Sequence, residues 1–449
     1  MSIIKALKSI LEHVLSRSVP AFAKSPLSAP TPYGAAPSGP PIAPRRSDAP
    51  PLDGGAHAEA PPFDRARLRS AVLAMFNPSQ PVENRIQLLG RRAELTQLLR
   101  VMMDLRTHAF VYGPRGAGKT SLMRAFGDYA DERGHLVIYH SCGGGCGFPE
   151  LFTPYLAELA SAGLPQREQE ELRHLLRHSP EGFGARALAG ALAGIADRDV
   201  ILVVDEYDRV EDPATRGEIA TLLKLLSDFR SRVQLLFVGI ARDVGELIEA
   251  HPSLRRHLVA IPLRPFDEAG IDDLFRRGAQ ATSLQFEDEA RDLIAATAAG
   301  SPYHLRLFCF CAAMAAIDKG SISVDRASTI AGLEYALDLW SSTNPTDAAL
   351  FGRLAASGEA ARHDLESFVR GRLAADRLPP GEGGPAAEAI DLASLALLAP
   401  ALGDDRGPGT HIFEDSLAPQ FLLAACALVN ERCEGAPEAV SRPLARRII

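Results

Sequence analysis

Residues 113–120, Gly-Pro-Arg-Gly-Ala-Gly-Lys-Thr, combine residue types and spacing that could bind phosphate. They match the pattern G-x-x-x-x-G-K-[ST], in which glycines let backbone N–H groups turn inward around a phosphate. The apolar run HAFVY precedes them and a helix-forming stretch follows, as the pattern requires. Lys119 would reach the β- and γ-phosphates of a nucleotide, and the Thr120 hydroxyl would ligate Mg²⁺. We expect ATP and Mg²⁺ to be bound by this loop, through Gly113, Pro114, Arg115, Gly116, Ala117, Gly118, Lys119, Thr120 and Ser121.

Two carboxylates, Asp205 and Glu206, follow the apolar run that begins at Val200. Ligands of open α/β sheets bind at the carboxyl ends of the strands, where these side chains would emerge. We expect Asp205 to hold Mg²⁺ through water and Glu206 to polarise an attacking water as general base. A strand that ends in two acids can also be a solvated edge, and the preceding P-loop pattern favours the catalytic interpretation. No N-K-x-D guanine-reading segment follows, which favours ATP over GTP.

The elements that must position these residues can be predicted from the hydrophobic pattern. Five short apolar runs alternate with helical segments, at residues 108–112, 135–140, 200–205, 233–240 and 258–263. This alternation predicts an α/β fold, a P-loop NTPase parallel sheet with helices on both faces. After Phe266 the pattern is helical, which indicates a helical lid.

The C-terminal stretch predicts helices near 346–357, 360–375 and 386–399, a turn at 404–409, the short strand HIF and a last helix from 415. Helices followed by a β-turn suggest a winged-helix-like module. The domain boundaries that we predict are an amphipathic helix at 1–18, a Pro-rich disordered linker at 19–62, an ATPase core at 63–265, a lid at 266–342 and the winged-helix-like domain at 343–449.

Composition restricts the class of protein. The net charge of −8 argues against a general nucleic-acid coat, although it leaves room for a local basic face. Six scattered cysteines without a secretory signal favour a reduced cytoplasmic setting. No run is long and apolar enough for a transmembrane segment.

With these motifs in place, residues from about 85 to 320 resemble the AAA+ ATPases, in particular the origin-recognition-complex-like and STAND branches. The stretch Leu88-Leu89-Gly90-Arg91-Arg92-Ala93-Glu94-Leu95 is similar to the segment that packs near adenine in this group. The P-loop, the acids at Asp205-Glu206-Tyr207-Asp208 and the strand Leu235 to Ala241 follow in the family's order. The resemblance implies an ATP-binding core whose lid contributes the turn Gly300-Ser-Pro302-Tyr-His304 to the nucleotide site. It therefore adds Leu89, Gly90, Arg91, Pro302 and His304 to the expected nucleotide-binding residues.

The chain also departs from the family pattern. The strand at the sensor-1 position ends Gly239-Ile240-Ala241, without the polar residue that would orient a hydrolytic water. No arginine stands at the usual sensor-2 position, where the chain has Tyr303 or His304, with Arg306 two residues further on. Arg255 and Arg256 stand where the family carries an arginine finger, which acts on a neighbouring subunit; adjacent arginines can also form a solvated face. Hydrolysis is therefore expected to be slow or partner-dependent.

Three functions are compatible with the sequence. The first is a switch whose nucleotide state controls homo-oligomer formation and the engagement of a protein partner by the tethered N-terminal helix. The second is a DNA-engaged initiator, loader or transposition helper, with Arg362, Arg370 and Arg372 as the best DNA candidates; their alternative is a solvent-exposed face. The third is an ATP-binding scaffold with little hydrolysis, suggested by the atypical sensor residues.

Overall fold

The computed structural model describes residues 63–78, 88, 90–178, 182–240, 244–245, 247–248, 252–356, 358–375, 399–400, 411–412 and 417–435. The predicted N-terminal helix and Pro-rich linker lie outside these ranges, as do Leu89, Ala241 and most of the predicted helix at 386–399. Within the described ranges, no helix is long and apolar enough to cross a membrane.

A five-stranded parallel sheet forms the centre of the first part of the chain, in the order β2-β3-β4-β1-β5. Its strands are β1 (His108–Tyr112), β2 (Leu136–Ser141), β3 (Val200–Asp205), β4 (Val233–Gly239) and β5 (Leu258–Pro262). Every residue of β3 and β4 is buried, as expected of central strands covered on both faces. The predicted α/β P-loop NTPase fold is confirmed.

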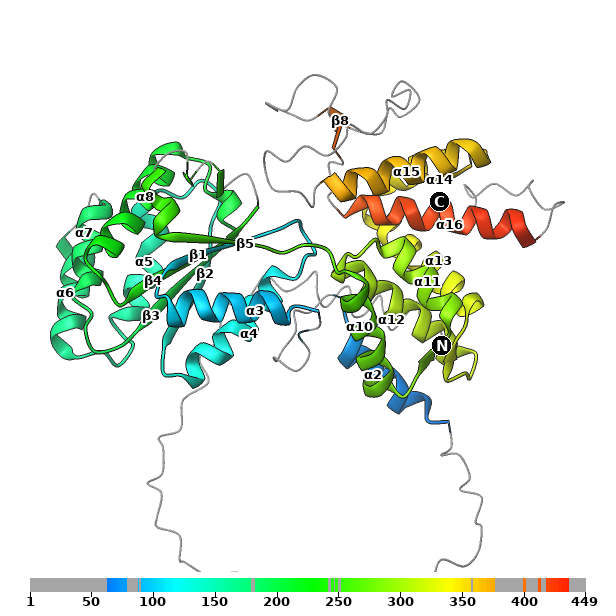
Figure 1. The fold of residues 1–449 in the computed structure, drawn as a ribbon, viewed down its shortest axis with the longest axis horizontal. Coiled ribbons are helices and arrows are strands. Elements are labelled where there is room, and N and C mark those ends of the chain that lie inside the picture. The colour runs from blue at the N-terminus through cyan, green and yellow to red at the C-terminus, as the bar shows by residue number, and fades with distance from the viewer. Residues whose placement is uncertain are drawn as a thin grey trace, which may run out of the picture. The chain divides into compact units, whose positions relative to one another are not determined.

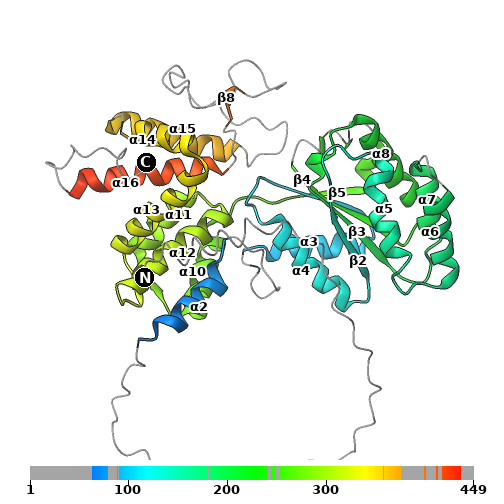
Figure 2. The ribbon, with the colours of Figure 1, turned by 180° about the vertical axis from the view of Figure 1, so that it is seen from behind.

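Two helical layers cover this sheet (Figure 1). The packing clusters show that alternate residues of the central strands face one layer or the other. Ile201 and Val203 pack with the layer of α3 (Arg92–Leu99), the π-helical turn η2 (Arg100–Asp104) and α4 (Lys119–Glu132). Leu202 and Val204 pack with the layer of α5 (Phe148–Leu159), α7 (Ala185–Ala193) and α8 (Pro213–Asp228), beside which lies α6 (Gln166–His178). Figure 2 shows the same two layers from the opposite side.

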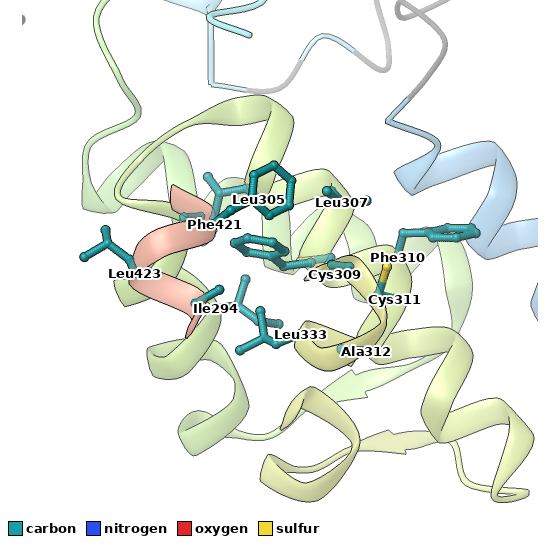
Figure 3. Packing of buried hydrophobic residues seen from close by; sticks show 14 of the residues in the cluster. Ile294, Leu305, Leu307, Cys309, Phe310, Cys311, Ala312, Leu333, Phe421 and Leu423 are labelled. Atoms are coloured by element: carbon teal, nitrogen blue, oxygen red, sulfur yellow. The ribbon is translucent and has the colours of Figure 1, made fainter. Parts of the chain in front are cut away.

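The helices after Phe266 have their own core, which the C-terminal helices share. The lid helices are α10 (Glu268–Thr282), α11 (Asp288–Ala298), α12 (Pro302–Asp318) and α13 (Arg326–Thr343). They are followed by α14 (Pro345–Ala355), α15 (Glu359–Ala375) and α16 (Ala418–Gly435). Side chains of α11, α12, α13 and α16 meet in this core, among them the labelled residues of Figure 3: Ile294, Leu305, Cys309, Leu333, Phe421 and Leu423. Lid and C-terminal helices therefore form one packed unit rather than two separate cores.

The predicted boundaries differ from this packing at one further helix. The prediction assigned the segment of α2 (Arg65–Phe76) to the ATPase core. In the structure, α2 packs against α10 and α12 instead. Its buried residues Leu68, Val72 and Phe76 belong to the core of the lid. An amphipathic helix has an apolar face, but that face does not specify which neighbour covers it.

The structure also has short strands after Phe266, where the pattern is mainly helical. β6 (Gln285–Phe286) pairs in parallel with β7 (Ser323–Val324) inside the lid. Near the C-terminus, β8 (Ala399–Pro400) pairs in antiparallel fashion with β9 (His411–Ile412), which falls on the predicted HIF strand. Two-residue strands are too short to show the period-2 pattern on which strand prediction relies. The winged-helix assignment stays a prediction.

Aspartate caps fix where several helices begin. Asp212 accepts hydrogen bonds from the backbone N–H of Ala214 and Thr215 at the start of α8. Asp267 accepts from Gly270 at the start of α10, directly after the core ends. Such caps satisfy backbone donors that the first turn leaves unpaired, and so they fix the residue at which each helix begins.

Candidate functional site

The P-loop occupies residues 113–118, between the end of β1 and the start of α4. Gly116 and Gly118 have φ angles of 76° and 87°, a left-handed conformation that glycine adopts without strain. Gly118 is the N-cap of α4, so the loop and the first turn of that helix direct N–H groups and the positive end of the helix dipole to one place. This is the backbone arrangement that binds phosphate.

Lys119, the first residue of α4, folds back over the loop. Its ammonium donates hydrogen bonds to the carbonyl oxygens of Gly113 at 2.7 Å and Pro114 at 3.1 Å. Neutral carbonyls are weaker partners for an ammonium group than a charged phosphate oxygen is. The Lys119 side chain is thus positioned at the loop, and its partners can be exchanged for phosphate.

Asp205 ends β3 at the same edge of the sheet, and both of its carboxylate oxygens have partners. One oxygen accepts the Glu206 backbone N–H at 2.7 Å, and the other accepts the hydroxyl of Tyr139 from β2. Burial and the nearby Asp205 charge raise the pKa of Tyr139, so its hydroxyl stays protonated and donates. A carboxylate has about four acceptor positions, so Asp205 can still bind a metal-bound water.

Sequence reasoning missed Tyr139, because its pairing with Asp205 depends on the register between two strands. Tyr139 and Asp205 are on neighbouring strands, where Tyr139 is in register with Val203 and Ser141 with Asp205. Side chains alternate between the two faces along a strand, so residues that are in register, or two positions away from being in register, lie on the same face of the sheet. Val137 and Val203 both pack toward α4, so Tyr139 and Asp205 lie on that face of the sheet.

Glu206 has a φ of 54°, a left-handed conformation that directs it out of the strand. Its carboxylate lies 3.2 Å from the Arg209 Nε, on the short helix η3 (Tyr207–Arg209). Both side chains are about half exposed, so this ion pair contributes little free energy and is easily exchanged. Glu206 can therefore accept a hydrogen bond from a water in the pocket.

A cavity of about 520 Å³ joins these groups. Its size is that of sites for ligands as large as a nucleotide. The core contributes residues 115–121, Asp205, Glu206, Asp208, Arg209 and Ile240; the lid contributes Phe266, Leu274, Pro302, Tyr303 and Arg306; and Pro78, Leu88 and Arg91 complete it. Apolar and aromatic side chains such as Leu88 and Phe266 are suited to covering a flat ring.

Arg306 of α12 lines this cavity, whereas sequence reasoning only noted its position. It is half-buried, its Nη2 donates to the Met75 carbonyl at 3.4 Å, and its buried Nε has no acceptor among the described residues. Burial lowers the pKa of Arg306 from its usual value. A half-buried cation whose Nε has no acceptor in the described part of the chain is suited to an anionic ligand in the cavity.

His304 does not lie at the cavity, which corrects the expectation that it binds nucleotide. Its side chain is wholly buried in the lid core, where its ring contacts Phe308 and Phe421. Its Nδ1 lies 2.9 Å from the Ser301 hydroxyl. Residues of the same turn, Pro302 and Tyr303, line the cavity instead. One step along a helix rotates the side chain by about 100°, so neighbouring positions face different surroundings.

Arg255 and Arg256 are exposed on the short helix η4 (Pro252–Arg256), and neither is among the described residues that line the cavity. A role on a neighbouring subunit stays a prediction. Arg362, a DNA candidate, is instead buried, with its Nε donating to the Asn430 side chain at 2.8 Å. Arg370 donates to the Ala296 carbonyl at 2.9 Å. Both arginines therefore stabilise contacts within the helical part.

Comparisons with known proteins are consistent with this site. Residues 87–238 match the family model described as AAA ATPase domain. The probable disease resistance protein RPP1 of Arabidopsis thaliana is 25% identical over 182 residues, which are 40% of this chain but only 14% of that protein. Residues 87–238 thus form an AAA ATPase domain, which contains the P-loop and both acids.

Similar solved structures share low sequence identity with the chain. The Walker-type ATPase PABY2304 of Pyrococcus abyssi is 17% identical, with a TM-score of 0.44 and coverage of 77% of this chain and 98% of that chain. The ORC1 protein of Aeropyrum pernix, in complex with DNA, is 18% identical, with a TM-score of 0.42 and coverage of 81% and 98%. The RuvB Holliday junction branch migration motor of Thermotoga maritima is 15% identical, with a TM-score of 0.38 and coverage of 71% and 91%.

Proposed function

We propose that the protein is an ATP-binding switch, in which Mg²⁺·ATP or ADP at the P-loop controls the arrangement of the lid and C-terminal helices and thereby assembly or partner engagement. One observation carries the proposal. A Cβ atom on Gly116 would lie 3.0 Å from both Tyr303 of α12 and Leu417, the residue before α16. Lid and C-terminal side chains thus pack directly on the loop, and phosphate binding there changes the surface against which they pack.

Each core residue has a role in this proposal. Lys119 binds the β- and γ-phosphates, Thr120 and Asp205 hold Mg²⁺, and Glu206 orients water as general base. ATP supplies a γ-phosphoryl group whose loss changes the charge in the site. Thr120, Asp205 and Glu206 line one cavity with the P-loop, which supports this assignment.

The proposal includes slow hydrolysis. Ile240 lines the cavity directly after β4, where a polar side chain would help to orient the water. An apolar side chain donates no hydrogen bond, so Glu206 must orient the water without that help. A neighbouring copy that places Arg255 or Arg256 at the site would accelerate the reaction, which links hydrolysis to homo-oligomer formation.

Phosphate release and nucleotide affinity test the assignment. We expect slow phosphate release by the wild type, its loss in Glu206→Gln with ATP binding retained, and an affinity at least about tenfold lower in Lys119→Ala, because a charge-assisted hydrogen bond is lost. Arg92→Ala, an exposed position, serves as the control. Binding without any turnover would favour the ATP-binding scaffold. Unchanged affinity in Lys119→Ala would contradict the proposed site.

DNA binding remains an outcome of the same test rather than part of the proposal. Of its three candidate arginines, Arg362 and Arg370 bond within the chain. Turnover that DNA stimulates at low salt, with the stimulation lost as salt rises, would favour the DNA-engaged alternative.

A further inference from the structure

Arg91 is a buried cation between the P-loop and the lid. Only 3% of its surface is exposed. Its Nη1 donates to the Glu94 carboxylate at 2.8 Å, and its Nη2 donates to the carbonyl oxygen of Ala117, in the P-loop, at 2.9 Å. Burial lowers the pKa of Arg91, whereas the Glu94 charge raises it.

The bond to Ala117 determines how the P-loop presents its next amide. In a trans peptide the C=O and the following N–H point in opposite directions. Because Arg91 holds the Ala117 carbonyl on its own side, the Gly118 N–H points to the other side. Gly118 is the N-cap of α4, where phosphate is expected to bind. Arg91 therefore orients a phosphate-binding donor without touching phosphate.

The flat face of Arg91 contacts the first residue of the lid. Its guanidinium carbon lies 4.8 Å from the centre of the Phe266 ring. The Phe266 backbone N–H donates to the Gly300 carbonyl at 2.8 Å, beside the turn that carries Pro302 and Tyr303. Gly90 fits below the same ring, because a Cβ there would lie 2.8 Å from it. One side chain thus contacts the P-loop and the point where core and lid join.

These contacts leave Arg91 unsuited to reading the base. Two of its nitrogens are used within the protein, and its buried Nε has no acceptor among the described residues. Arginine reads the two acceptors of guanine well, whereas adenine places an N–H₂ donor beside its N7 acceptor. A donor-only side chain does not match that pair.

We propose that Arg91 is a positioning residue that couples the P-loop to the lid, by holding the Ala117 peptide through Nη2 and the Phe266 ring through its face. The inference rests on the proposed nucleotide site and adds the residue through which the lid responds to it. Lysine in its place keeps the charge but lacks the planar fork that bonds Glu94 and Ala117 while covering the ring.

The experiment uses the full chain with Arg91→Met, Arg91→Lys and, as control, Arg92→Met on the exposed face of α3. Spin labels at Arg167→Cys and Asp288→Cys, both highly exposed, report the distance between core and lid after Cys146→Ser and Cys433→Ser. Without nucleotide, we expect both Arg91 variants to broaden the distance distribution and Arg92→Met to leave it unchanged. If Arg91→Met fails to fold, Arg91→Lys supplies the comparison.

The second measurement is affinity for Mg²⁺·ADP and Mg²⁺·GDP. We expect both affinities to fall about tenfold or more in the Arg91 variants, with their ratio unchanged, because one charge-assisted bond is lost from the loop. A changed ADP to GDP ratio with unchanged distances would overturn the inference in favour of base reading, and variants equal to Arg92→Met in either measurement would overturn the coupling. If the wild-type protein bound neither nucleotide, the proposed function would be overturned. The distances between the two spin labels would then decide the role of Arg91.

Discussion

Two imidazole side chains, those of His108 and His304, are buried where a charge would be poorly solvated. Burial lowers the pKa of His108 to about 4 and that of His304 to about 3. The His108 Nδ1 accepts the Leu235 backbone N–H at 2.9 Å, which requires a neutral ring with its proton on Nε2. Both residues are therefore neutral in the folded protein at ordinary pH.

This burial makes stability depend on pH. As pH falls below about 6.5, the unfolded chain takes up a proton on His304 that the folded chain does not, so the unfolding free energy decreases by about 1.4 kcal/mol per pH unit until pH nears the folded pKa. His304→Phe removes this loss. We expect the stability of the variant relative to wild type to rise from pH 7 to pH 5 in urea unfolding.

Exposed His363 provides the control, because His363→Phe makes the same change on the surface of α15. Equal pH slopes for wild type and His304→Phe would contradict a neutral buried ring. Nucleotide affinity is expected to be unchanged in His304→Phe at pH 7, since the side chain lies outside the cavity.

At this scale, the sequence predicted those site residues whose chemistry is tied to a motif, such as Lys119 and Asp205, and the structure places both at the cavity. The hydrogen-bond partners of the site residues were not predicted from the sequence. Tyr139 donates to Asp205 across two strands, and Arg91 bonds Ala117 at a separation of 26 residues. Such pairs depend on strand register and loop conformation, which residue spacing alone does not determine.

Among the elements, α12 and α13 pack closely at one glycine. A Cβ on Gly332 of α13 would lie 2.5 Å from the Ala312 backbone nitrogen and 2.7 Å from its Cα, in α12. Backbone atoms cannot rotate away as a side chain can, so the helices must separate. We expect Gly332→Ala to lower the unfolding free energy by about 1–3 kcal/mol.

Gly352 of α14 provides a matched control, because no described atom beyond its chain neighbours and the adjacent backbone of its own helix lies within 4 Å of its added Cβ. There alanine only reduces backbone freedom, and we expect a gain of about 0.5–1 kcal/mol. Urea unfolding of both variants checks the difference. A Gly332→Ala protein as stable as Gly352→Ala would contradict the close packing of α12 on α13.

Elements with a long, regular pattern were predicted well, and the five strands of the sheet are the clearest example. The packing partner of an amphipathic helix was not predicted. The apolar face of α2 was evident in the sequence, but its packing against the lid was not. The pair β6–β7 was missed because each strand has two residues. Elements were therefore predicted where their hydrophobic pattern was long enough to recognise. The packing partners of the helices depend on tertiary contacts, which the pattern does not contain.

On the scale of the whole molecule, the packing of Tyr303 and Leu417 on Gly116 relates the nucleotide site to helices far along the chain. The turn that carries Tyr303 was expected at this site, whereas no motif in the sequence indicated the contact of Leu417. The α/β class of the fold followed from alternating apolar runs, and the expectation of nucleotide binding followed from the P-loop pattern. The proposed switch requires nucleotide binding and the contact on Gly116 together, because a ligand at the P-loop must alter contacts made by the lid and by the residue before α16.

Sedimentation velocity of the full chain tests the proposed switch most directly, with Mg²⁺·ADP compared with Mg²⁺ and a non-hydrolysable ATP analogue at equal protein concentration. We expect the analogue to shift the chain to a larger species, and Lys119→Ala to sediment alike in both nucleotides. The same monomer in both nucleotides for the wild type would contradict the account.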